Sequence, residues 1–228
     1  LIKPCIRYTG VVFCVTYAGK PKLTQIPNLM KNLLLSALAV CLAVLQVNAQ
    51  TRYLDEVFEE VTVTTDVVYG QNITVITALQ GLPPMMEDLK CDIYEPTGDT
   101  ETERPLLLIF HTGNFLPPYV NGSAQGTKSD NWEVEMATRY AKMGYVVASC
   151  DYRLGWNPLA ATQEERTLQL IQAAYRGVQD SRTAVRFFRK SNAEDGNPYG
   201  VDPGKIGMIG NGTGGYITLA SSTISDYN

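Results

Sequence analysis

Four glycines crowd into one short turn near the end of the sequence, which reads G-N-G-T-G-G over residues 210–215. An apolar run at 206–209 precedes the turn, and a segment at 216–221 that is compatible with a helix follows it. This order is typical of a strand that turns sharply into a helix. Glycines are needed there because the backbone must reverse within a few residues, with at least one φ angle that a Cβ atom would resist.

Two kinds of chemistry use such a turn. One is a cradle for phosphate groups, and the other is the nucleophile elbow G-x-S-x-G, in which a strained turn presents a catalytic hydroxyl at the top of a sheet. The spacing fits the elbow, with Gly210 in the first position and Gly214 in the fifth. The middle position, however, is Gly212, which has no hydroxyl. Thr213 lies one position too late, and its β-branch fits a strained elbow badly.

The nucleotide-binding interpretation rests on the glycines alone. The pattern G-x-x-x-x-G-K-[ST] does not occur, and the acidic residue expected about 20 positions after a dinucleotide fingerprint would lie beyond Asn228. We therefore favour the elbow over the phosphate cradle.

The strands that would position this turn are visible as apolar patterns. Continuous apolar runs at 106–110 and 145–149 predict strands that are buried on both faces, as in the middle of a sheet covered by helices. Alternating apolar residues at 89–93 predict a half-buried strand. The mixed pattern at 52–72 predicts one or two short strands at a sheet edge.

Two helices are predicted between these strands. Asp130 and Thr162 are each followed by a glutamate three residues later, which is the pattern of a capping box. Gly144 sits where the first helix would end, and Gly177 is expected to break or bend the second. Strand, helix, strand, helix, strand is the order of a doubly wound, mostly parallel sheet, so we predict an α/β fold.

Composition excludes some classes of partner. The 228 residues are 45% hydrophobic and 18% charged, which is ordinary for a globular protein with one substantial core. The net charge of −4 argues against a nucleic-acid partner, which would favour a basic face. Nothing in the residue pattern calls for a metal ion or another cofactor.

The N-terminal part has the pattern of an export signal. The first methionine opens residues 30–49, in which the apolar run Leu33–Val47 is followed by small residues up to Ala49. A run of about 15 residues suits a signal peptide and falls short of the ~20 that span a bilayer. We therefore predict an upstream extension at 1–29, a signal peptide at 30–49 and a secreted or periplasmic domain at 50–228. The alternative is a single membrane anchor, but a stable anchor would need a longer run.

Two cysteines, Cys91 and Cys150, fall in the exported part. An oxidising compartment permits a disulfide between them. Both lie inside apolar strand patterns, so two buried free thiols are the alternative.

Together, four segments resemble the carboxylesterase and lipase branch of the α/β-hydrolase family. The strand and loop L-L-L-I-F-H-T-G-N-F resembles a strand that runs into H-G-G-G-F, and G-Y-V-V to Y-R-L resembles the strand that follows. The remaining two are a helix with a D-P turn and the elbow itself. The resemblance covers roughly residues 86–222, and the segments lie at 106–115, 144–154, 180–203 and 210–215.

The resemblance implies a role for each residue of the site. Backbone N–H groups of Gly113, Asn114 and Thr213 would form the oxyanion hole, and Gly212 would stand in the place of the nucleophilic serine. Loss of one oxyanion donor typically costs about 2.7–4 kcal/mol of transition-state stabilisation. In the family, the histidine that corresponds to His111 organises the loop and is not the catalytic base.

The chain departs from the family pattern in three ways. Thr112 and Asn114 replace glycines, and Gly212 replaces the serine. His111 is the only histidine, and just 13 residues follow Gly215. We therefore expect the fold to be cut short after the elbow, with the acid and the base outside this chain. Restoring Gly212→Ser in a longer protein that carries both would add the nucleophile, at the cost of backbone strain.

Two functions are consistent with this sequence. The first is an exported relative of carboxylic ester hydrolases that is inactive as it stands. The second is a non-catalytic module that keeps the hydrolase pocket for a ligand or a protein partner. In both cases the expected partner is a small-molecule ester or another ligand.

Overall fold

The computed structural model describes residues 7–8, 11–12, 51–77 and 81–224. The chain divides into two compact units, Leu1–Ala49 and Gln50–Asn228. In the first unit, β1 (Arg7–Tyr8) pairs antiparallel with β2 (Val11–Val12). The predicted signal peptide at 30–49 lies outside the described residues. In the part of the chain that is described, no helix is both long and apolar enough to cross a membrane.

The second unit is built on a five-stranded mixed sheet with the order β3-β4-β6-β5-β7. Strands β6, β5 and β7 run parallel to one another, β4 pairs antiparallel with β6, and β3 pairs antiparallel with β4. This arrangement confirms the predicted α/β fold. The strands span Val61–Thr74 (β3), Met85–Pro96 (β4), Arg104–Phe110 (β5), Val146–Cys150 (β6) and Val201–Gly210 (β7).

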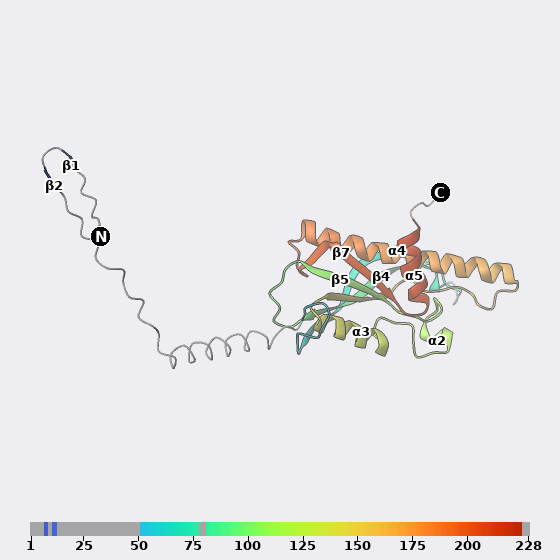
Figure 1. Cartoon of the computed structure of the whole chain (residues 1–228). Coiled ribbons are helices and arrows are strands. Elements are labelled where there is room, and N and C mark those ends of the chain that lie inside the picture. Colours follow the sequence, from blue (N-terminus) through green and yellow to red (C-terminus); the bar gives the residue numbers. More distant parts are fainter. Residues whose placement is uncertain (1–6, 9–10, 13–50, 78–80, 225–228) are drawn as a thin grey trace. The chain divides into compact units, whose positions relative to one another are not determined.

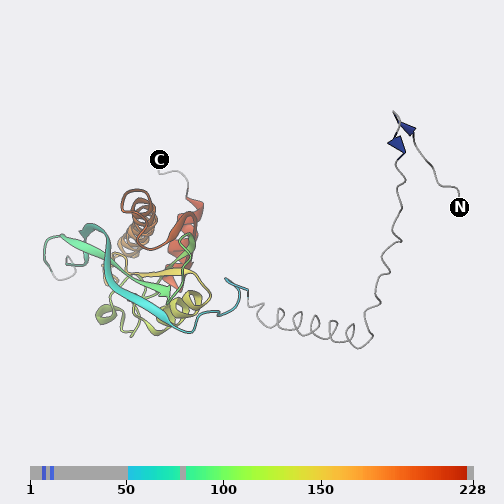
Figure 2. The same ribbon diagram turned by 90° about the vertical axis from the view of Figure 1, so that its left-hand side faces the viewer.

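Helices cover both faces of the sheet (Figure 1, Figure 2). They are α2 (Pro118–Asn121), α3 (Asn131–Lys142), α4 (Gln163–Glu194) and α5 (Thr213–Thr223). The larger core cluster joins Leu106, Leu108 and Phe110 of β5 to α4 and α5, and the smaller one joins Ile109 to α3. Alternate residues of β5 therefore enter opposite cores, as predicted for a strand that is buried on both faces.

Gly177 was predicted to break or bend the second helix, and it does not break it. Helix α4 continues through it for 32 residues, from Gln163 to Glu194. A Cβ atom at Gly177 would lie 2.6 Å from Ile217 Cδ1 of α5. The glycine therefore allows two helices to pack closely. The capping box at the start of α4 is confirmed, since the Thr162 side chain accepts from the Glu165 N–H and the Glu165 carboxylate accepts from the Thr162 N–H.

The first helix begins where predicted, but without a capping box. Asp130 is the N-cap of α3, yet its side chain bonds no N–H group of that helix. Its carboxylate accepts instead from Gly126 N at 2.6 Å and from Thr127 Oγ1 at 2.8 Å, so it closes the loop that precedes the helix. Gly144 follows the helix with φ 102°, as expected for the residue after a helix end.

The edge of the sheet is one long strand rather than the one or two short ones predicted. Strand β3 covers 14 residues and contains register shifts near Thr64 and Val68. Across the sheet, Cys91 of β4 faces Cys150 of β6 in register, and both are buried free thiols in this structure.

Candidate active site

The predicted site residues come from two segments that begin side by side. Phe110 at the end of β5 pairs with Gly210 at the end of β7, and Asn211 N donates to Phe110 O at 3.1 Å. Strand β5 lies between β6 and β7 in the sheet. The connection from β5 to β6 moves to one side of β5, and the connection from β6 to β7 crosses back to the other side, so the order of the strands reverses at β5. Ligands of open α/β sheets bind outside the carboxyl ends of the strands at such a switch point.

The turn after β7 has the strained geometry that its glycines predict. Gly212 is the N-cap of α5 with φ 52° and ψ −116°, outside the regions that residues with a Cβ atom ordinarily occupy. Gly210 and Gly214 lie so close that a Cβ on Gly210 would sit 2.1 Å from the carbonyl carbon of Gly214. The strand can therefore turn directly into the helix, which starts at Thr213.

The side chain of Thr112 fills the space beside Gly212. A Cβ atom on Gly212 would lie 2.0 Å from Thr112 Oγ1 and 2.8 Å from Thr112 Cβ. Contacts this short do not occur between packed atoms, so any side chain at position 212 requires Thr112 to move. Thr112 is half-buried and stands where the sequence pattern of the resemblance has a glycine.

The loop after β5 holds its backbone in an unusual conformation. Gly113, Asn114 and Phe115 have φ angles of 116°, 57° and 56° in succession. Their carbonyls accept from Leu116 N at 2.9 Å, Trp156 Nε1 at 2.8 Å and Gly155 N at 2.8 Å, respectively. Non-glycine residues with positive φ persist only where their surroundings hold them. These hydrogen bonds hold the loop that contains Gly113 and Asn114, two of the residues predicted to donate to an oxyanion.

Tyr152 connects this loop to α5. Its hydroxyl donates to His111 O at 2.9 Å and lies 3.2 Å from Thr213 Oγ1. The single hydroxyl proton of Tyr152 is used on the carbonyl, which can only accept, so Thr213 is the donor in the second bond. The Thr213 hydroxyl is therefore already engaged. Burial raises the pKa of Tyr152.

His111 is fully buried and its imidazole contacts the loop and Tyr152. Nδ1 lies 2.6 Å from Thr112 O, so Nδ1 carries the proton, and the ring stacks on Tyr152 with centroids 4.4 Å apart. Nε2 has no hydrogen-bond partner among the described residues and lies 3.6 Å from Asp151 Oδ1. Burial lowers the pKa of His111 to about 4.

The pKa of Asp151 is shifted upward, whereas that of His111 is shifted downward. Burial raises the pKa of its carboxyl group to about 6, although the Lys128 N–H donates to it at 2.7 Å. Between about pH 4 and 6.5, unfolded His111 binds a proton that the native state does not, so its contribution to stability rises with pH. Native Asp151 binds a proton that the unfolded chain releases between its ordinary pKa and about pH 6, so its contribution falls as the pH rises. The two contributions oppose each other over most of this range.

A cavity of about 730 Å³ opens beside Asn114 and Thr213. Its walls come from the loop after β5, from α4 and from α5, and most of them are apolar. This size suits a small organic ligand. The lining residues are Asn114, Phe115, Leu116, Val120, Asn121, Trp156, Pro158, Leu170, Ile171, Ala174, Thr213 and Tyr216.

The structure brings together most of the residues singled out in the sequence. Asn114 and Thr213 line the cavity, while Gly113 and Gly212 lie in the two adjoining turns. The imidazole of His111 contacts Asp151 and Tyr152. In the described part of the chain, no group of three or more His, Cys, Asp or Glu residues could hold a metal ion.

Sequence reasoning missed three contributors. Thr112 was noted only as a replaced glycine, and Tyr152 only as part of a motif. Trp156 lines the cavity and holds the Asn114 carbonyl across 42 residues of sequence, a separation that leaves no local signal.

The sheet order, the turn after β7 and the loop after β5 are those of an α/β-hydrolase fold that resembles the carboxylesterases. The BD-FAE family model matches residues 91–227, more than half of the chain. This protein belongs to the BD-FAE family.

Solved structures of esterases are similar to this chain over part of their length. Esterase 2 of Thermogutta terrifontis, in a form phosphoramylated by tabun, is 23% identical with a TM-score of 0.45, covering 69% of this chain and 46% of its own. A hyperthermophilic esterase from the archaeon Pyrobaculum calidifontis is 17% identical with a TM-score of 0.40, covering 89% of this chain and 49% of its own. The chain thus spans about half the length of these structures. No curated protein matches the sequence.

Proposed function

We propose that this chain is an exported carboxylesterase-like protein whose site binds an ester or a related small ligand without hydrolysing it. Gly212 stands where the nucleophilic serine of such an enzyme is expected, and N–H groups of Gly113, Asn114 and Thr213 face the bound ligand. The observation that carries the proposal is the fit of Thr112 into the space beside Gly212. Gly212 in place of the serine and Thr112 in place of a glycine fit each other sterically. This fit favours a site that is adapted to the absence of serine over the isolated loss of one residue.

The cavity supports binding in the absence of chemistry. Its apolar walls can bury the hydrocarbon part of a ligand, which contributes roughly 25 cal/mol per Å² of apolar surface removed from water. The neighbouring backbone N–H groups can donate hydrogen bonds to the carbonyl oxygen of the ligand. His111 contributes by holding this loop in place, because its Nδ1–H and its stacking on Tyr152 fix the segment that starts at Thr112.

A second candidate is an enzyme that uses the Thr112 hydroxyl. Thr112 Oγ1 lies close to the place that a serine side chain at position 212 would reach. A hydroxyl nucleophile needs a base within hydrogen-bond reach. Among the described residues, no hydrogen bond connects Thr112 Oγ1 to such a base, because His111 Nδ1 is used on a carbonyl and Nε2 is next to Asp151. We therefore favour binding.

The test is to measure binding and turnover with the same compound. A short-chain p-nitrophenyl ester is expected to quench the fluorescence of Trp156 on saturation, while nitrophenol release stays at the rate in buffer. Ala174→Phe should fill the cavity and weaken binding at least tenfold. Leu168→Phe on the same helix is the control, because Leu168 does not line this cavity. Enzyme-like release that is lost in Thr112→Val would establish the second candidate instead.

Export is a separate part of the proposal. The apolar run Leu33–Val47 and the small residues up to Ala49 support cleavage after Ala49 and a secreted or periplasmic location without a stable anchor. N-terminal sequencing of the mature product is expected to begin at Gln50. A mature protein that still contains the apolar run would contradict this part and leave the site proposal unaffected.

A further inference from the structure

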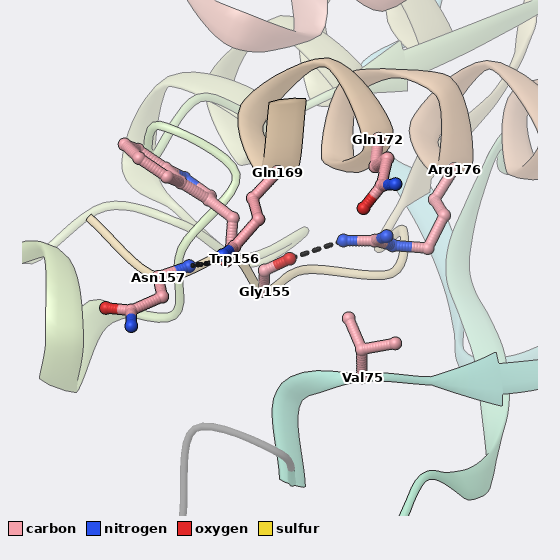
Figure 3. Close-up of a pocket in the computed structure, with 7 residues that line it drawn as sticks. All are labelled: Val75, Gly155, Trp156, Asn157, Gln169, Gln172 and Arg176. Carbon is pink, nitrogen blue, oxygen red and sulfur yellow. Dashed lines mark hydrogen bonds between the residues drawn. The ribbon is translucent and has the colours of Figure 1, made fainter. Parts of the chain in front are cut away.

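A second cavity, of about 420 Å³, lies between the first half of α4 and the loop 155–157 (Figure 3). Among its lining residues it shares only Trp156 with the candidate active site. Its lining is polar on one side and apolar on the other. The lining residues are Val75, Gly155, Trp156, Asn157, Gln169, Gln172 and Arg176.

The polar side of this cavity comes from one face of a single helix. Gln169, Gln172 and Arg176 are spaced three and four residues apart on α4, so their side chains share a face. Figure 3 shows all three extending from the helix toward the loop that contains Gly155, with Val75 on the opposite side. An amphipathic helix normally packs apolar residues on its inward face. Here the helix directs three polar side chains into a hollow.

Arg176 brings a positive charge that forms no ion pair within 4 Å among the described residues, although Asp180 lies near enough to raise its pKa in part. Its Nη2 donates to Gly155 O, and its Nε is buried without a hydrogen-bond partner in the described structure. Burial lowers the pKa of Arg176, and the charge of Arg153 lowers it further. The nearby carboxylate of Asp180 is already used, because it accepts from Arg153 Nη2 at 2.7 Å and from Arg153 N at 2.8 Å.

The remaining groups of the cavity favour a negatively charged ligand. No Asp or Glu is among the lining residues, and the Gly155 carbonyl is occupied by Arg176. Gln169 uses Oε1 to accept from Asn157 N at 2.8 Å, which leaves its amide N–H groups free to donate. Arg176 Nη1 takes part in no hydrogen bond in the described structure, so it can donate a charge-assisted hydrogen bond to a carboxylate oxygen, with the carboxamide donors beside it.

We propose that this cavity binds the carboxylate of a small apolar organic acid. Arg176 is the anchor, Gln172 and Gln169 supply further N–H donors, and Val75 with Trp156 packs against the apolar part of the ligand. Trp156 also lines the larger cavity and donates to the Asn114 carbonyl, so the two ligand sites share one wall. The inference is independent of the residue at position 212 and does not require ester hydrolysis.

The experiment is a calorimetric titration of the full chain with sodium benzoate at low ionic strength. Saturable binding is expected, at least tenfold tighter than that of the uncharged isostere benzamide, and weaker at higher salt. Equal binding of the two compounds would overturn the proposal, because the charge would then contribute nothing. Inorganic phosphate is the third ligand, and phosphate binding as tight as that of benzoate would overturn the assignment to a carboxylate.

Two variants locate the site. Arg176→Gln should weaken benzoate binding at least tenfold, while Arg186→Gln, an exposed arginine further along α4, should leave it unchanged. Because Arg176 also bonds Gly155, a second variant guards against misfolding. Gln172→Glu changes an exposed helix position and places a carboxylate four residues before Arg176, where it occupies the guanidinium. Unchanged benzoate binding in this folded variant would refute the site.

Discussion

Restoring a serine at position 212 is expected to fail unless residue 112 is made smaller at the same time. Gly212→Ser places a Cβ atom 2.0 Å from Thr112 Oγ1. Overpacking of this kind costs about 1–3 kcal/mol, and a non-glycine residue at φ 52°, ψ −116° costs about 1–3 kcal/mol more. We therefore expect the single variant to lose about 2–6 kcal/mol of unfolding free energy.

Replacing Thr112 by glycine should recover the cost of overpacking but not the cost of the strained backbone. Thr112→Gly alone should lose about 1 kcal/mol, from the added backbone entropy of glycine. In the double variant the clash is gone while the backbone strain remains. The loss should therefore be smaller than the sum of the two single losses by about 1–3 kcal/mol, a range typical of residues in contact.

Urea unfolding of the four proteins measures this double-mutant cycle directly. Thr112→Ser is the matched control, because it keeps the Oγ atom that obstructs position 212 and should give little of the coupling. A cycle that is additive within about 0.5 kcal/mol would refute the steric argument. The sequence alone attributes the cost of the serine to backbone strain, and the structure adds the overlap with Thr112.

Two further predictions concern pH and helix packing. Asp151→Asn removes the contribution to stability that opposes that of His111. The unfolding free energy of the variant, relative to that of the unsubstituted protein, should therefore rise from about pH 4 to pH 6. A difference in unfolding free energy that stays constant over this range, measured by urea unfolding, would contradict the pKa of about 6 for Asp151. Gly177→Ala should destabilise by about 1–3 kcal/mol, because its Cβ would lie 2.6 Å from Ile217 Cδ1, and Ile217→Val should reduce the loss. Alanine in an unobstructed helix would instead stabilise by roughly 1 kcal/mol, so a raised urea midpoint would show that α4 and α5 are not in close contact.

The strands and the turn could be predicted because their signals are local. The run at 106–110 is apolar on both faces, which only a central strand requires, and it forms β5. The glycine spacing at 210–215 predicts that the backbone approaches itself closely within a few residues. The backbones of Gly210 and Gly214 are in contact, as this spacing implies. Strand position and turn geometry both follow from neighbours in the sequence.

Features that depend on distant partners could not be read from the sequence. Gly177 was expected to interrupt a helix, because a helix-internal glycine is locally unfavourable, but the residue that requires it is Ile217 of α5. Thr112 and Gly212 meet only because β5 and β7 are adjacent in the sheet. The same limit applies to the cavity, whose walls come from segments that approach one another only after α4 and α5 have packed.

The fit between Thr112 and Gly212 also restricts the order in which substitutions can accumulate. In a relative with serine at 212, a threonine at 112 would overlap with it, so position 112 must stay small for as long as the serine is present. Thr112 can arrive only after the serine has gone or together with its loss. The reverse route is costly in the same way, because a serine that returns first meets Thr112. Two positions about a hundred residues apart in the chain are therefore coupled. The side chain at 212 can be lost in one substitution, whereas its return is favoured only after residue 112 has become smaller.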